Sequence, residues 1–178
     1  MRNRDWQRVI AGLGIIAPMA AIGHAETYLS ETQAAAVLFP NVTLTPTWVD
    51  LTPDQVKAIQ KASGQKPLSR RVRVFWGPHQ EALFIDRVIG KHEFITYAVA
   101  IDGDGKVKGL EIMDYRETYG YQVREASWRQ HFVGKTSKDP LKLDRDIPNI
   151  SGATLSSKHV TDGMRRILQT YDLLKTKL

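Results

Sequence analysis

The chain of 178 residues carries 25 lysines and arginines against 19 aspartates and glutamates, and it contains no cysteine. The length fits one domain with at most a small accessory part. The absence of cysteine excludes disulfide bonds, thiolate metal ligands and iron–sulfur clusters. A net charge of +6 without a dense basic run does not suit an extended nucleic-acid groove, so we expect no nucleic-acid partner.

Residues 1–25 have the pattern of a secretory signal peptide. Three arginines make the start positive, residues 9–22 carry no charge, and Gly23 and Ala25 are small residues at the positions that a signal peptidase recognises. The uncharged run is shorter than the roughly twenty residues that span a bilayer, which makes a retained anchor the less favoured alternative. We therefore expect an exported, periplasmic protein that is cleaved near Ala25.

Residues 26–68 predict a small helical lobe at the N-terminus. Two capping-box patterns, at residues 30–33 and 52–55, each precede a short helix. Residues 42–49 alternate between apolar and polar side chains as a strand does, with a proline that favours an edge position.

From residue 72 the hydrophobic period changes to two, which indicates β-strands. Four strands are expected, at residues 72–76, 83–89, 94–101 and 107–115. A Gly-Asp-Gly turn at residues 103–105 joins the last two, so the strands should form an antiparallel sheet. Residues 124–132 then predict a short helix, and residues 135–146 a charged surface loop.

Apolar side chains recur at spacings of three and four over residues 155–174, which predicts a long C-terminal helix with one apolar face. The sequence therefore predicts an α+β fold, in which a twisted antiparallel sheet packs against this helix. The sheet and helix together make up a domain of residues 69–178, preceded by the small helical lobe.

The run Ser151-Gly152-Ala153-Thr154 leads into this helix. The first turn of a helix offers unpaired N–H groups and a partial positive charge, which together suit a phosphate. Small residues at 152 and 153 keep the approach open. Four hydroxyl groups could bond a phosphate there or be esterified by it, those of Ser151, Thr154, Ser156 and Ser157. The plainer alternative is that Ser151 or Thr154 only caps the helix.

Residues 150–157, Ile-Ser-Gly-Ala-Thr-Leu-Ser-Ser, resemble the signature of the FMN-binding domain family. This family also occurs in the flavin subunits of the sodium-translocating NADH:quinone reductase and of a related electron-transport complex. A flavin transferase links FMN through a phosphoester to the threonine that closes its Ser/Thr-Gly-Ala-Thr motif. The resemblance implies that Thr154 carries FMN covalently. It also implies that the cofactor is bound by Ser151, Gly152, Ala153, Leu155, Ser156 and Ser157. Pro148 stands where the family usually has an aspartate, and the nearest acid is Asp146.

A looser similarity to the same family lies upstream, where a Glu-Thr-Pro-Gly segment precedes an aromatic-rich helix that ends in Gly-Lys. This chain has Glu117-Thr118-Tyr119-Gly120, and the later residues Trp128, Phe132, Gly134 and Lys135. The resemblance implies that Glu117, Thr118 and Tyr119 contribute to cofactor binding. The candidates for packing against the flavin ring are Tyr119, Tyr121 and Trp128, although aromatic residues before a helix are more often part of the core.

The resemblance favours an exported flavoprotein that passes electrons between redox partners rather than a substrate-specific enzyme. Its implied partners are a flavin transferase for maturation and a membrane-bound or haem-containing redox protein. Two alternatives stay open. The first is a non-flavinylated ligand-binding or scaffolding module, and the second is a substrate-converting oxidoreductase. The four histidines after residue 25 show no ligand spacing, so we expect no metal site.

The signal-peptide interpretation predicts that the exported protein begins at Glu26, because the polar pair Glu26-Thr27 follows the small residue Ala25. N-terminal sequencing of the exported form checks this. A protein that keeps Met1 and stays in the membrane fraction would show instead that residues 9–22 are an anchor.

Overall fold

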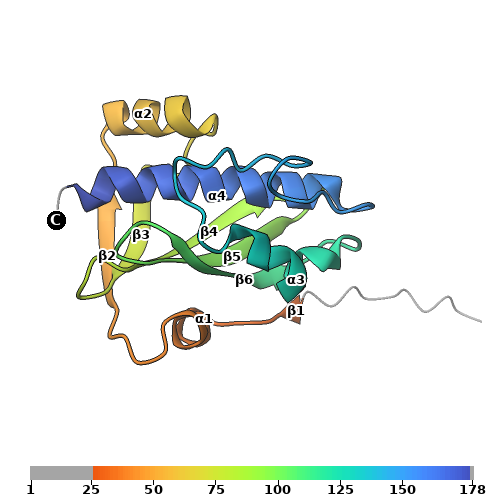
Figure 1. Ribbon diagram of the computed structural model, residues 1–178, viewed down its shortest axis with the longest axis horizontal. Coiled ribbons are helices and arrows are strands. Elements are labelled where there is room, and N and C mark those ends of the chain that lie inside the picture. The colour runs from red at the N-terminus through yellow and green to blue at the C-terminus, as the bar shows by residue number, and fades with distance from the viewer. Residues whose placement is uncertain (1–25, 177–178) are drawn as a thin grey trace, which may run out of the picture.

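The computed structural model describes residues 26–176, which form a six-stranded antiparallel sheet with helices on both faces (Figure 1). The strands are β1 (Glu26–Thr27), β2 (Thr45–Asp50), β3 (Arg71–Trp76), β4 (Ala82–Ile89), β5 (Phe94–Ile101) and β6 (Val107–Tyr115). Their order across the sheet is β1-β6-β5-β4-β3-β2. The expected signal peptide lies outside the described residues.

The helices are α1 (Glu31–Leu38), α2 (Pro53–Ser63), α3 (Ala126–Arg129) and α4 (Thr154–Lys175), with 3-10 turns η1 (Tyr121–Arg124) and η2 (Gln130–Phe132) around α3. The long helix α4 lies along one face of the sheet, and α1 lies on the other (Figure 1). None of the helices within residues 26–176 is long and apolar enough to cross a membrane. The predicted α+β fold of a sheet packed on a long C-terminal helix is confirmed.

The alternation of side chains along the strands divides the core into two layers. Val74, Phe84 and Tyr97 point to the α4 side, where they form one large cluster with the apolar stripe of α4. Leu83 and Ala98 point to the other side, where they pack with α1 in a smaller cluster. Because both faces are covered, β4 and β5 are nearly continuous apolar runs rather than alternating ones.

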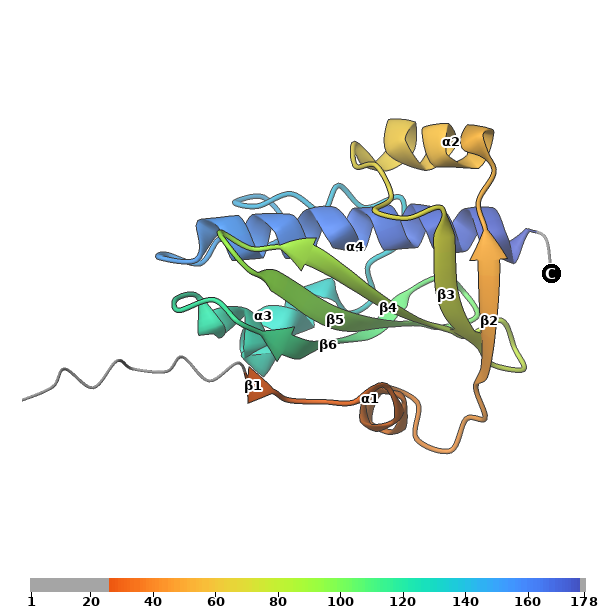
Figure 2. The same cartoon turned by 180° about the vertical axis from the view of Figure 1, so that it is seen from behind.

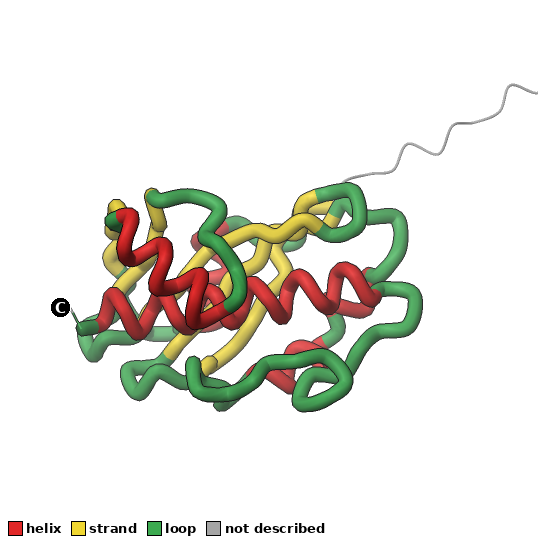
Figure 3. Tube along the Cα trace, turned by 90° about the horizontal axis from the view of Figure 1, so that it is seen from above, coloured by secondary structure: helices red, strands yellow, loops and turns green. Residues whose placement is uncertain are grey.

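Residues 26–68 are integrated into the sheet rather than folded as a lobe of their own. β1 and β2 are its two edge strands, paired with β6 and β3 respectively. Both predicted capping boxes are present, and they start α1 and α2. The two helices nevertheless lie far apart, because α1 covers the sheet whereas α2 crosses over the C-terminal half of α4 (Figure 3).

The position of α4 on the sheet depends on a close approach at Gly163. A side-chain carbon at this position would lie 2.1 Å from the hydroxyl oxygen of Tyr97 and 2.9 Å from a methyl carbon of Val88. One turn further on, the buried guanidinium of Arg166 donates to the carboxylate of Asp86 at 2.6 Å. Only glycine allows the helix to come this close to β4 and β5.

Replacing Gly163 with alanine should therefore destabilise the fold. In an unconstrained helix interior this change stabilises by about 1 kcal/mol. Here the added methyl group overpacks the interface, and we expect a net loss of about 1 to 3 kcal/mol in urea unfolding. The control is the same change in a Tyr97→Phe background, where the nearest atom is gone and the loss should be smaller. If Gly163→Ala were as stable as the unmodified chain, the close packing of α4 against Tyr97 and Val88 would be contradicted.

Candidate functional site

The loop before α4 turns at Gly152, whose backbone has a φ of +78°. This left-handed conformation is open to glycine and strained for other residues. A side-chain carbon at Gly152 would meet no atom within 4 Å, so the constraint on this residue is its backbone angle and not a lack of space. The N–H of Ala153 donates to the carbonyl of Ile150 at 2.9 Å and closes the turn.

The N-terminus of α4 carries no side-chain cap. The cap position is Ala153, so neither Ser151 nor Thr154 caps the helix, and no acidic residue lies in the first turn. The first N–H bonded within the helix is that of Ser157, which donates to the carbonyl of Ala153 at 2.9 Å. The N–H groups of residues 154–156 therefore need an acceptor from outside the helix, and an anion is the natural one.

Burial separates the four hydroxyl groups of the motif into two pairs. Ser156 and Ser157 are buried, with exposed fractions of 4% and 0%. The hydroxyl of Ser157 bonds to Asn149 at 3.2 Å and to the carbonyls of Ala153 and Thr154 at 3.1 Å. Ser151 and Thr154 are exposed. Of the two accessible hydroxyls, Thr154 is the one inside the first helical turn.

The segment after β6 lies against this loop. A side-chain carbon at Gly120 would come within 2.8 Å of the side chain of Ala153, and Gly120 itself has a φ of +92°. The hydroxyl of Tyr115 donates to the carbonyl of Tyr119 at 2.5 Å and lies 3.2 Å from the hydroxyl of Ser156. Tyr115 thus joins residues 115–120 to the first turn of α4.

Tyr115 is a site residue that the sequence pattern did not reveal. A tyrosine at the end of an alternating strand predicts only a core position. Burial raises the pKa of Tyr115, and the hydrogen bond with Ser156 only partly opposes this. The phenol therefore stays protonated and keeps its donor for the carbonyl of Tyr119.

Glu117 holds the turn between β4 and β5 together. Its carboxylate accepts hydrogen bonds from the N–H groups of His92 at 2.6 Å and Glu93 at 3.0 Å. Desolvation alone would raise the pKa of Glu117, but the hydrogen bonds from these backbone groups outweigh it, and the pKa is lowered. The structure thus gives this predicted cofactor residue a structural task, while its neighbour Thr118 is exposed.

The three aromatic candidates differ in their exposure. Trp128 is 5% exposed, its indole N–H donates to the carbonyl of Pro148 at 2.8 Å, and its ring packs edge-on against Phe132. It therefore belongs to the core, as the alternative interpretation held, and its hydrogen bond fixes the loop that leads to residue 151. Tyr119 and Tyr121 are 79% and 59% exposed, so their rings are free to contact a ligand.

Two titratable groups near the motif, Asp146 and His159, bond to the backbone of the protein. Asp146 accepts from the N–H groups of Leu141 and Lys142 at 3.0 and 2.8 Å, so it serves its own loop. The Nδ1 atom of His159 lies 2.6 Å from the carbonyl oxygen of Ile89. Within residues 26–176 no group of three His, Cys, Asp or Glu side chains is placed to hold a metal ion.

Comparisons with known proteins show what the chain is similar to. Residues 90–169 match the FMN-binding domain. The chain is 31% identical over 89 residues to one of the subunits of the Na(+)-translocating ferredoxin:NAD(+) oxidoreductase complex of Acetobacterium woodii. This alignment covers 45% of the chain and 43% of the relative, so the chain spans less than half of the relative's length.

The fold is similar to the crystal structure of one of the subunits of the Na(+)-translocating NADH-quinone reductase from Parabacteroides distasonis. The TM-score is 0.52 at 14% sequence identity, over 82% of this chain and 84% of that one. At this identity the likeness supports the fold alone. The sequence matches and the fold together confirm the resemblance to the FMN-binding domain family.

The task of Glu117 can be tested by its pH dependence. A carboxylate whose pKa is lowered on folding stabilises the fold above its unfolded pKa of about 4.5, and the stabilisation is lost as the pH falls through the folded pKa. Glu117→Gln should thus cost about 1 kcal/mol in urea unfolding at pH 7, and this cost should shrink as the pH falls below 4.5. A loss of the same size at pH 7 and below pH 4.5 would mean that the charge of Glu117 plays no part.

Proposed function

Because residues 90–169 match the FMN-binding domain, we propose that the chain is a flavoprotein that carries FMN covalently on Thr154 and transfers electrons. The observation that carries this proposal is the exposed hydroxyl of Thr154 in the first turn of a helix without a cap. A bound phosphate there would accept hydrogen bonds from the unpaired N–H groups of residues 154–156.

The attachment is a phosphoryl transfer to the hydroxyl of Thr154. The threonine oxygen attacks the phosphorus atom of an activated FMN donor, for which a flavin dinucleotide is the suitable chemical class. The new bond joins the threonine oxygen to phosphorus, the diphosphate bond breaks, and a nucleoside monophosphate leaves, while the hydroxyl proton passes to solvent. The resulting phosphodiester keeps one negative charge, which faces the partial positive charge of the α4 N-terminus. A separate flavin transferase would catalyse this step, as the family resemblance implies.

The residues around Thr154 fit a flavin whose ring lies at the protein surface. Tyr119 and Tyr121 offer exposed aromatic faces for the isoalloxazine ring, and Leu155 adds apolar surface, with 43% of it exposed. The flavin would supply the redox chemistry, and the protein would position it. A surface-bound ring gives redox partners direct access, which suits electron transfer better than conversion of an enclosed substrate.

The names of the relatives support a place in a membrane redox system. The relative from Acetobacterium woodii is named as part of a Na(+)-translocating complex that oxidises or reduces ferredoxin and NAD(+), and the structural relative as part of a Na(+)-translocating NADH-quinone reductase. We infer that this chain exchanges electrons with a membrane-bound or haem-containing partner. The signal-like residues 1–25 support a periplasmic location for this exchange. A covalent bond then prevents loss of the cofactor in a compartment where free FMN is scarce.

The attachment can be tested by intact mass after co-expression with a flavin transferase. The unmodified chain should gain the mass of one FMN phosphoester, and Thr154→Ala should match the bare polypeptide while still folding. Thr154→Ser keeps a hydroxyl and should be labelled in part. Gly152→Val should lose labelling because valine strains the backbone at a φ of +78°.

Ser151→Ala removes the other accessible hydroxyl of the loop, and peptide mapping of the labelled fraction of this variant should still place FMN on Thr154. If Thr154→Ala still gained FMN and peptide mapping placed it on Ser151, the residue assignment would fail although the flavoprotein would remain. If neither the unmodified chain nor any variant gained flavin, the chain would be the non-flavinylated binding module of the alternative interpretation.

A further inference from the structure

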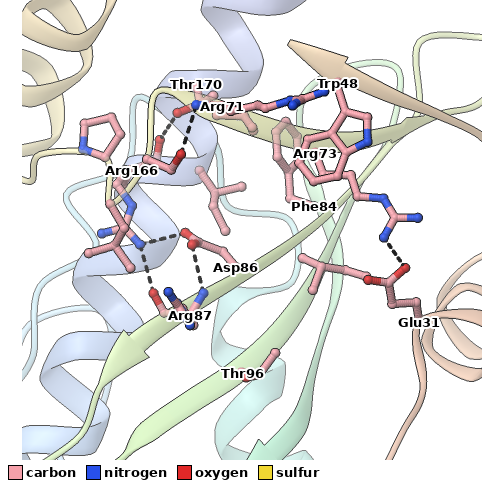
Figure 4. Close-up of a pocket in the computed structure, with 16 residues that line it drawn as sticks. Glu31, Trp48, Arg71, Arg73, Phe84, Asp86, Arg87, Thr96, Arg166 and Thr170 are labelled. Atoms are coloured by element: carbon pink, nitrogen blue, oxygen red, sulfur yellow. Dashed lines mark hydrogen bonds and ion pairs between the residues drawn. The ribbon is translucent and has the colours of Figure 1, made fainter. Parts of the chain in front are cut away.

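A groove opens in the sheet between β3 and β4, away from the FMN-binding motif. The two strands are paired only where residues 74–76 face residues 82–84, and beyond this point they separate. Figure 2 shows β2 and β3 turned away from β4, β5 and β6. The separation leaves a cavity of about 320 Å³, to which α4 contributes Arg166, Ile167 and Thr170 (Figure 4).

The charged side chains of this groove do not balance. Four arginines and two acids line it. Arg73 pairs with Glu31 at 2.6 Å, and Arg166 pairs with Asp86 at 2.6 Å. Arg71 and Arg87, one from each wall, form no ion pair within residues 26–176, and both are exposed. The groove therefore presents to solvent two guanidinium groups that form no ion pair with the described residues, although Asp50 faces Arg71 across the β2–β3 ladder and Asp86 directly precedes Arg87.

Aromatic rings hold these two arginines in place. The guanidinium of Arg71 lies 4.9 Å from the ring centre of Trp48, and that of Arg87 lies 4.7 Å from the ring centre of Phe94. Trp48 and Phe94 are themselves 55% and 45% exposed. A guanidinium stacked on a ring keeps its edge N–H groups free for a carboxylate, and less side-chain entropy is lost when that bond forms.

The rest of the groove favours an extended, partly apolar ligand. Its lining includes Leu68, which is 59% exposed, as well as Ile85 and Val72. The strand segments 71–73 and 85–87 border the opening, and no ladder pair joins them across it. Backbone groups at such an edge can pair with an added strand, while pockets beside the edge receive alternate side chains. At Arg87 an added strand would have to displace the side chains of Asp86 and Arg166, which already bond to its N–H and carbonyl.

From these features we propose that the β3–β4 groove is a docking site for an acidic, extended segment of a partner protein. Acidic side chains of that segment pair with Arg71 and Arg87 on opposite walls, and its apolar side chains enter the cavity between them. The docking does not require the flavin, so it stands independently of the function proposed above.

The test uses a fluorescent synthetic peptide in which glutamate and valine alternate, with fluorescence anisotropy as the readout. A peptide of alternating lysine and valine is the control for apolar binding. The purified chain should bind the acidic peptide and not the basic one, and binding should weaken as salt is added. Failure to bind the acidic peptide, or equal binding of both peptides, would overturn the proposal.

Charge reversal locates the site. The double variant Arg71→Glu, Arg87→Glu should bind the acidic peptide about tenfold or more weakly and should gain affinity for the basic one. The matched control Lys138→Glu, Arg145→Glu makes the same change in net charge at two residues of the 135–146 loop, and it should bind within about twofold of the unmodified chain. Circular dichroism confirms that both variants fold. If both double variants lost the same affinity for the acidic peptide, binding would respond to net charge alone, and the proposed site would be wrong.

Two further measurements separate the remaining explanations. Trp48→Ala should weaken binding of the acidic peptide, because it removes both an apolar contact and the platform of Arg71. The Thr154→Ala chain should bind the peptide normally, whatever its flavin content. If vesicles that contain phosphatidylserine bound the unmodified chain, lost binding in the Arg71→Glu, Arg87→Glu variant and displaced the peptide, the groove would serve a lipid surface, and the proposal of a protein partner would be wrong.

Discussion

The placement of α4 along the sheet is the constraint on which the site depends. Gly163 allows the helix backbone to approach the hydroxyl of Tyr97, and the buried pair of Arg166 with Asp86 fixes the helix against β4. A buried ion pair gains little net stability, but breaking it leaves a costly unpaired charge, so it selects one register of the helix. With Gly163 fixed, the first residue of α4 lies nine residues earlier, about 13.5 Å along the axis. This distance brings Thr154 to the end of the sheet beside the loop that follows β6.

Burial then decides which hydroxyl group is available. Rotation of an ideal helix by about 100° per residue turns Ser156 and Ser157 towards the core when Thr154 and Leu155 face solvent. Tyr115 binds one of the buried serines, so the hydrogen bonds that hold the loop in place also withdraw that hydroxyl from chemistry. The missing cap has the complementary effect. A serine or aspartate at position 153 would satisfy the N–H groups that an anion needs, whereas alanine leaves them available.

The sequence predicted most of the secondary structure, because strand and helix periods are local signals. The strands of residues 72–115 and the helix of residues 155–174 agree with the structure to within one or two residues. The positions of α1 and α2 on opposite sides could not be predicted, since a capping box marks where a helix begins and not what it packs against. The same limit applies to the site. The motif at 151–154 is a local pattern that can be recognised in the sequence, whereas Tyr115 acts through contacts with residues 119 and 156 that no spacing reveals.

The groove and the motif at Thr154 are joined by the strands that run between them. β4 and β5 pass from the groove to a turn that is held by Glu117, and the segment that follows Glu117 packs on the loop before α4. If a partner docks in the groove as proposed, it would be held beside Arg87 and Phe94, on the two strands that lead to the proposed flavin site. The groove would supply affinity and orientation for the partner. The exposed isoalloxazine ring of the proposed FMN, near Tyr119, would supply the contact for electron transfer. Such a division suits a carrier, because the charge-paired contact at the groove can form and dissociate quickly without disturbing the cofactor.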